Sequence, residues 1–122
     1  MPKVRETNLR MTPGLQEQII EVHPEVCLWA MNDRSPMKHR KTRVVGRSER
    51  LDLLARAFDC DFKAAFESIR SKLERIQDVK RDDFLDACAA AWTAARYARG
   101  EHGTLPPDPP TDRRGLRMEI VY

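Results

Sequence analysis

The sequence lacks the features that mark membrane, secreted or fibrous proteins. Its three cysteines are an odd number without the spacing of a disulfide framework or a zinc site, which favours reduced thiols in a cytoplasm. The longest apolar run is six residues, from Ala87 to Trp92, and is too short to cross a bilayer. Residues 1–13 are charged rather than apolar, so we expect no signal peptide. We therefore predict a cytoplasmic protein with no membrane contact.

The length and charge describe one small domain with an uneven charge distribution. A chain of 122 residues and 14.1 kDa is predicted to form a single domain over residues 1–122. The net charge is only +3, but residues 1–50 contain ten basic and six acidic residues, whereas residues 51–122 contain twelve and thirteen. The positive excess therefore lies in the first half, where it favours an anionic partner.

The apolar periodicity predicts a helix-rich α+β domain with two or three short strands. Residues 19–23 are mostly β-branched and end at a proline, which predicts a strand that runs directly into a helix starting at Pro24. Three further helices are expected, the first from Ser48, the second after an Asp61 cap and the third from Asp82 to Arg99. Residues 104–110 are too rich in proline for regular pairing, and residues 116–122 alternate as a final strand.

An acidic group opens the last predicted helix. Asp82, Asp83 and Asp86 are three and four residues apart, so they lie on neighbouring positions of one helix face and could share a divalent cation. Phosphodiester hydrolases use such oxygen ligands, because Mg²⁺ binds few carboxylates and keeps water and phosphate as its other ligands. The alternative is that Asp82 and Asp83 cap the helix, a role that Asp86, one turn inside, cannot take.

Two polar residues interrupt the first predicted strand. Glu21 lies between apolar neighbours, where a carboxylate is costly unless it is paired, hydrogen-bonded or bound to a metal. His23 shares its face of the strand and could act as an acid–base group or a ligand, although such a histidine more often caps the following helix.

A basic connector joins the first predicted helix to the second. Between residues 34 and 50, Glu49 is the sole acidic residue. Such a density of positive charge fits contacts with phosphates, and a solvated loop is the alternative. No aromatic residue alternates with these cations, so base stacking is not expected here. The residues that we predict to bind nucleic acid are Lys38, Arg40, Lys41, Arg43 and Arg47.

Taken together and in order, several blocks resemble one family. They are EVHPEVCLWAMN (21–32), KHRKTRVVGRSERLDLL (38–54), DDFLDACAAAWTAARYARG (82–100) and PPDPPTDRRGLRMEIVY (106–122), preceded by PKVRETNLRMTPGLQEQ (2–18). The sequence is similar to the family catalogued as domain of unknown function 429, described as predicted nucleases with an RNase H-like fold.

The resemblance implies a partial RNase H-like fold whose carboxylates bind Mg²⁺ or Mn²⁺ for phosphodiester cleavage. By its position in the resemblance, Glu21 matches an acidic residue that the family has on a central strand. The acidic start of the family's last catalytic helix is matched by Asp83 and Asp86, with Asp82 beside them. The similarity is to the C-terminal half of the family, so we expect most of the sheet and one carboxylate to be missing. The resemblance thus predicts a chain that is inactive by itself.

Two functions follow from these observations. In the first, the chain is half of a metal-dependent nuclease. In the second, it is a non-catalytic module that binds nucleic acid or protein and forms oligomers through a free strand edge. The unpaired edge of the strand at residues 19–22 predicts a homodimer, because a second copy can add its own strand there.

Overall fold

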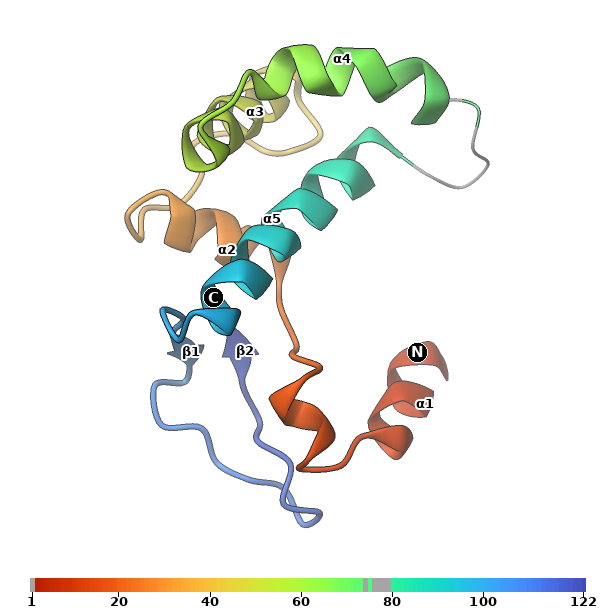
Figure 1. The fold of residues 1–122 in the computed structure, drawn as a ribbon, viewed down its shortest axis with the longest axis vertical. Coiled ribbons are helices and arrows are strands. Elements are labelled where there is room, and N and C mark those ends of the chain that lie inside the picture. The colour runs from red at the N-terminus through yellow and green to blue at the C-terminus, as the bar shows by residue number, and fades with distance from the viewer. Residues whose placement is uncertain (1, 74, 76–79) are drawn as a thin grey trace.

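The computed structural model describes residues 2–73, 75 and 80–122 and has an α+β architecture in which helices predominate (Figure 1). Within these residues, three helices pack around the last helix, which runs diagonally across the view, and a small antiparallel sheet lies near the C-terminal end of that helix (Figure 1). In chain order the elements are α1 (Pro2–Arg10), the short 3-10 helix η1 (Leu15–Glu17), α2 (Pro24–Met31), α3 (Val44–Phe58), α4 (Phe62–Leu73), α5 (Arg81–Ala98), β1 (Thr104–Leu105) and β2 (Ile120–Val121).

Helices α2 to α5 follow the local signals of the sequence closely. Pro24 is the first residue of α2, and the carboxylate of Asp61 accepts a hydrogen bond from the Ala64 N–H at 3.0 Å, which caps the start of α4. Helix α5 ends before Gly100, whose φ of 70° suits glycine. Helix α3 begins at Val44 rather than at the predicted Ser48. Its first turn has no apolar stripe, because Val44 and Val45 are exposed and Gly46 has no side chain.

In the part of the chain that the structure describes, two adjoining core clusters are joined by α5. One cluster contains Cys27 and Leu28 of α2, Leu53 of α3 and Ala89 of α5. In the other cluster the predicted stripe of α4 supplies Phe62 and Phe66, which are buried against Leu54 of α3 and Leu85 of α5. Helix α5 therefore contributes to both clusters and packs against α2 and α3. The predicted stripe residues Leu73 and Ile76 lie outside the described side chains.

The sheet differs from the one that the sequence predicts. β1 pairs with β2 antiparallel, with Thr104 opposite Val121, although β1 falls in the segment expected to be extended without pairing. The prediction of a strand at residues 19–23 was wrong, because this segment forms only a single parallel bridge, from Val22 to Val121. β2 is thus flanked by β1 on one side and by Val22 on the other. Because residues 19–23 form no strand in the described structure, the free strand edge predicted there does not form.

Helix α1 was not expected, and it stands apart from the other helices (Figure 1). None of its residues is buried. It is attached at its C-terminal end by Arg114, whose guanidinium donates hydrogen bonds to the carbonyl oxygens of Asn8, Leu9 and Met11. Within the described residues, the helices are all too short or too polar to cross a lipid bilayer.

Candidate phosphate-binding site

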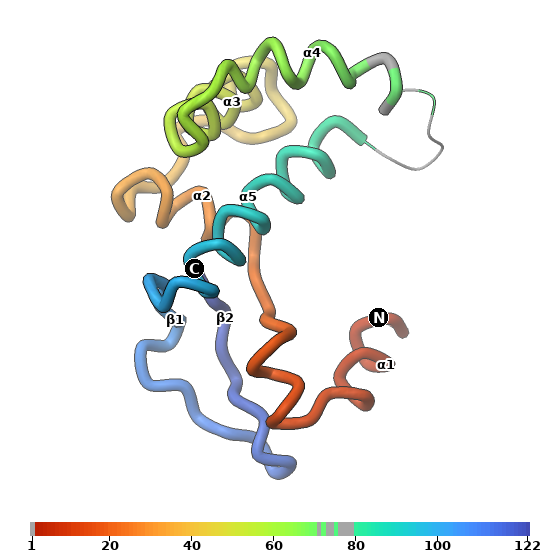
Figure 2. The backbone as a smooth tube through the Cα atoms, in the orientation of Figure 1, coloured from red at the N-terminus to blue at the C-terminus, as the bar shows by residue number. Residues whose placement is uncertain are grey.

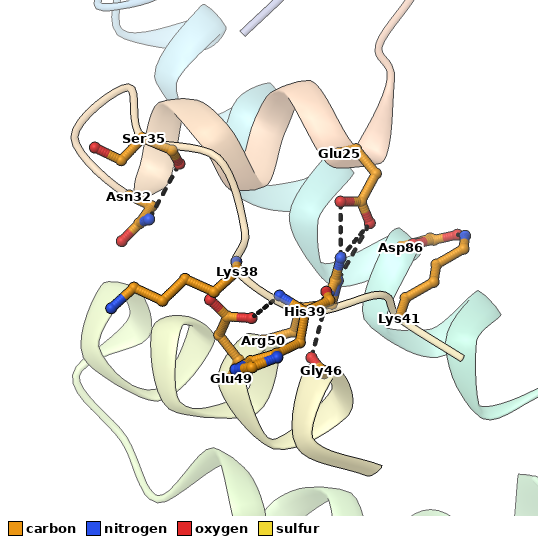
Figure 3. Close-up of polar contacts among 10 residues, drawn as sticks. All are labelled: Glu25, Asn32, Ser35, Lys38, His39, Lys41, Gly46, Glu49, Arg50 and Asp86. Atoms are coloured by element: carbon orange, nitrogen blue, oxygen red, sulfur yellow. Dashed lines mark hydrogen bonds and ion pairs between the residues drawn. The ribbon is translucent and has the colours of Figure 1, made fainter. Parts of the chain in front are cut away.

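A buried arginine fixes the basic connector, residues 32–43, which runs from the end of α2 to the start of α3 (Figure 2). Arg50 of α3 is only 3% exposed and forms a two-pronged ion pair with Glu25 of α2, at 2.8 Å for the shortest contact. The same guanidinium donates to the backbone oxygens of His39, at 3.0 Å, and Gly46, at 2.8 Å (Figure 3). Arg50 therefore ties α2, the connector and α3 together at one point.

Two more contacts hold the middle of the connector against α3. The carboxylate of Glu49 accepts hydrogen bonds from the backbone N–H groups of Lys38, at 2.8 Å, and His39, at 3.0 Å. Desolvation opposes ionisation, but these N–H groups and nearby cations together lower the pKa of Glu49 below its ordinary value of 4.5. The Arg40 carbonyl lies so close to Gly46 that an added Cβ would approach its oxygen to 2.0 Å. Only glycine fits at this position without moving the connector.

Fixed in this way, the connector places Lys41 against the start of α5. Its Nζ lies 3.1 Å from Oδ2 of Asp86, in a pair whose side chains are 41% and 24% exposed (Figure 3). The hydrogen bond to Asp86 raises the pKa of Lys41 against the effect of desolvation, and the charges of Asp86, Glu25 and Asp82 raise it further. Three carboxylates from two helices thus act on one ammonium group.

A second cation–carboxylate pair lies alongside, between α3 and α5. Nε of Arg47 is 3.8 Å from Oδ1 of Asp82, which is too long for a hydrogen bond. Both atoms are buried, and neither has a hydrogen-bond partner in the described part of the chain. Oδ1 of Asp82 is therefore paired with the charge of Arg47 but lacks a hydrogen-bond donor among the described residues.

The remaining predicted site residues occupy different environments. Asp83 is exposed and accepts a hydrogen bond from the Lys80 N–H at 2.7 Å, so it caps α5 as the alternative interpretation expected. Glu21 is exposed, and its backbone oxygen accepts a hydrogen bond from the Val121 N–H at 2.9 Å. His23 occupies the N-cap position of α2, but its side chain makes no capping hydrogen bond.

Among the described residues, three of the predicted phosphate contacts have no intramolecular partner. Lys38, Arg40 and Arg43 are exposed, and within residues 2–73, 75 and 80–122 their side chains form no hydrogen bond or ion pair. They lie next in sequence to Lys41, which pairs with α5, so one short segment presents both partnered and unpartnered cations. In the same described ranges, no three His, Cys, Asp or Glu side chains lie together in a way that could hold a metal ion.

The family described as "Protein of unknown function (DUF429)" matches residues 1–111. The chain belongs to this family. Neither the curated proteins nor the solved structures include a match to it. In this DUF429 member, the matched range includes the whole connector and all of α5, so both halves of the candidate site belong to the family domain.

Two residues of this site were not predicted as functional from the sequence. In the sequence, Glu25 is only a favourable charge in the first turn of a helix, and Arg50 is one of many cations between residues 34 and 50. Arg50 lies one turn before Leu53 and Leu54 on the buried face of α3, where an arginine is rarely found unless it is paired. Its burial depends on Glu25, which is distant in sequence, so no local signal could have revealed it.

Proposed function

We propose that this DUF429 member is the phosphate-binding and carboxylate-bearing part of a metal-dependent nuclease with an RNase H-like fold, which cleaves DNA or RNA in the cytoplasm. The observation that carries the proposal is the approach of the basic connector to the acidic start of α5, with Lys41 bonded to Asp86. These two groups were predicted separately, one for phosphate contacts and the other for cation binding. A phosphodiester hydrolase needs both within reach of one phosphate.

The connector supplies the binding energy for a nucleic-acid backbone. Lys38, Arg40 and Arg43 are free of intramolecular ion pairs in the described residues, so phosphate contacts there replace no protein bond. With Lys41 included, about four contacts on duplex DNA predict a log–log salt slope of roughly −3 to −4. Because Glu49 and Arg50 hold the connector backbone, little ordering is required on binding.

The carboxylates of α5 suit a hard divalent cation. Mg²⁺ or Mn²⁺ would be held by Asp86 and Asp82, whose buried Oδ1 has no hydrogen-bond partner in the described structure, and phosphate and water would complete the ligands. When bound, such a cation would polarise the phosphate and lower the pKa of an attacking water. Two carboxylates are enough for a Mg²⁺ site of this kind, so the lack of a three-residue group within residues 2–73, 75 and 80–122 does not oppose it.

The other predicted residues keep narrower roles in the proposal. Glu21 and Asp83 stay predicted ligands on the resemblance alone, and Asp83 also caps α5. His23 is exposed and its side chain is not used to cap α2, so its imidazole is available to transfer a proton to or from a substrate.

The experiment measures binding and cleavage separately. Binding of a fluorescent duplex is titrated at several salt concentrations for the wild type, for Lys41→Ala with Arg43→Ala, and for a matched Lys63→Ala with Arg70→Ala control on α4. We expect the connector variant to weaken binding for all sequences and to flatten the salt slope, and the control to change neither. Binding that is undetectable at low salt would contradict the connector's role.

Cleavage is assayed with Mn²⁺ for the chain alone and for the chain mixed with an N-terminal half of the family. We expect Mn²⁺-dependent cleavage in at least one of these samples, and Asp86→Asn should abolish it while leaving metal-free duplex binding intact. If neither sample cleaves DNA or RNA, the nuclease proposal fails and the non-catalytic binding module becomes the better description.

A second proposal, self-association, is favoured by the exposed helix α1. The accessible surface is 8701 Å², whereas a compact monomer of this mass exposes about 6,700 Å². A nine-residue helix is marginal without packing, yet Val4 and Leu9 of α1 are 58% and 66% exposed. The excess of about 2,000 Å² exceeds the roughly 800 Å² that each partner buries in a stable dimer. We therefore propose a homodimer that covers α1 rather than a free strand edge.

Light scattering over a hundredfold dilution tests this second proposal. The wild type should dissociate on dilution, and Leu9→Asp should be monomeric throughout. Val44→Asp, on an exposed apolar residue of α3, is the matched control and should behave as the wild type does. A wild type that is monomeric and cooperatively folded at every concentration would refute the dimer.

A further inference from the structure

The ion pair between Lys41 and Asp86 joins the two functions that the proposed nuclease must combine. One partner comes from the predicted phosphate-binding set and the other from the predicted cation-binding set. At 41% and 24% exposure, such a pair is in contact with solvent and contributes little to stability. It can therefore be exchanged at little cost, unlike the buried pair between Arg50 and Glu25.

The two partners have different preferred ligands. A lysine ammonium is a compact single charge that binds phosphate well, and a carboxylate is the ligand that Mg²⁺ and Mn²⁺ prefer. When a divalent cation and a phosphate are both present, Lys41 and Asp86 each gain a preferred ligand by separating: the ammonium binds the phosphate and the carboxylate binds the cation. The charges of Glu25 and Asp82 also act on the Lys41 ammonium, so carboxylates of α2 and α5 both attract it.

The backbone around Lys41 allows this exchange without refolding. The Glu49 carboxylate accepts from the N–H groups of Lys38 and His39, and Arg50 donates to the His39 oxygen. Arg40 lies against Gly46, so four contacts fix the chain just before Lys41. The lysine side chain is half-exposed and has several rotatable bonds. Only these bonds need to turn for Nζ to leave Asp86 and meet a phosphate at the surface.

Resting on the proposed function, we infer that Lys41 is a tethered counter-ion: it occupies Asp86 while no metal is bound, and it moves to a substrate phosphate when a divalent cation takes the carboxylate. Metal binding and nucleic-acid binding then strengthen each other, because each favours the same exchanged state. Lys41 is also what prevents the carboxylates from attracting metal strongly before substrate arrives.

The first measurement is Mn²⁺ binding by calorimetry, with no nucleic acid present. The variants are Lys41→Met, Asp86→Asn and, as a matched loss of one positive charge from the same connector, Lys38→Met. We expect Lys41→Met to bind Mn²⁺ about two- to fivefold more tightly than the wild type, the factor set by losing a surface ion pair. Lys38→Met should stay near the wild type, and Asp86→Asn should bind weakly.

The second measurement is the coupling between Mn²⁺ and a short phosphorothioate strand, which resists hydrolysis. In the wild type, Mn²⁺ should tighten strand binding, and the strand should tighten Mn²⁺ binding by the same factor. In Lys41→Met this coupling should be lost, although Mn²⁺ still binds.

The outcomes separate this inference from the proposed function. Equal Mn²⁺ affinity in the wild type, Lys38→Met and Lys41→Met, with coupling retained, would overturn the counter-ion role and leave the nuclease proposal intact. No Mn²⁺ binding in any variant, with thermal melts unchanged, would overturn both. Tighter binding in Lys41→Met together with lost coupling supports the inference whatever the cleavage assay gives for the isolated chain.

Discussion

Replacing Arg50 with methionine should reveal how much of the domain depends on one buried guanidinium. Methionine keeps a similar length and apolar stem but removes the charge and all the hydrogen-bond donors. The change breaks the ion pair with Glu25 and leaves the backbone oxygens of His39 and Gly46 without this donor. Helices α2 and α3 and the connector would all lose their common contact.

The contacts that Arg50→Met removes determine the expected loss in the free energy of unfolding. Breaking a buried ion pair by removing one partner costs about 3–5 kcal/mol. The Glu25 side chain is 37% exposed and can regain water, so the cost of this step falls well below that range. Each carbonyl oxygen that loses its donor adds about 1 kcal/mol. The sum is about 3 kcal/mol, which lowers the melting temperature by about 10 °C for a domain of this size.

Urea unfolding followed by circular dichroism measures this free energy, and a thermal melt checks it. Arg56→Met is the matched control, because Arg56 is exposed on the same helix and has no polar partner in the described residues. It should change stability by less than about 0.5 kcal/mol. Arg50→Lys should fall between the two, because lysine keeps the charge but cannot reach all three partners. If Arg50→Met melts within about 2 °C of the wild type, the guanidinium does not hold the connector.

Three further predictions test the same region and the core. Gly46→Ala should cost about 2 kcal/mol or more in urea unfolding, because its Cβ would meet the Arg40 carbonyl, while Gly14→Ala, with nothing within 4 Å, should cost far less; equal effects would contradict the close approach. The pKa of Glu49 in the folded protein is lower than its ordinary value of 4.5, so the ionised carboxylate contributes its full stabilisation above pH 4.5. This contribution should disappear as the pH falls through the pKa of the folded state. Glu49→Gln should therefore flatten the acid limb of a plot of stability against pH, and an unchanged limb would argue against the contact. With a thiol reagent, exposed Cys60 should react at once and buried Cys27 only after denaturation; rapid reaction of all three thiols would contradict this core.

Much of the helical structure could be predicted from the sequence, because its signals are local. The apolar repeat of Phe62 and Phe66, the Asp61 cap and the stop at Gly100 each act over one or two turns, and they mark α4 and the end of α5 correctly. The same reasoning failed at residues 19–23, where β-branched residues predicted a strand. A strand needs a partner along its length, and only Val22 meets one.

The members of the candidate site could be named from the sequence, but their partners could not. Composition identified the cations of the connector, and helical spacing put Asp82 and Asp86 on one face of α5. That Lys41 meets Asp86, and that Arg50 is buried with Glu25, depends on α2, α3 and α5 packing together around a shared core. Charge and periodicity are properties of a short stretch of chain, whereas an ion pair between residues 45 positions apart exists only once the whole core has formed.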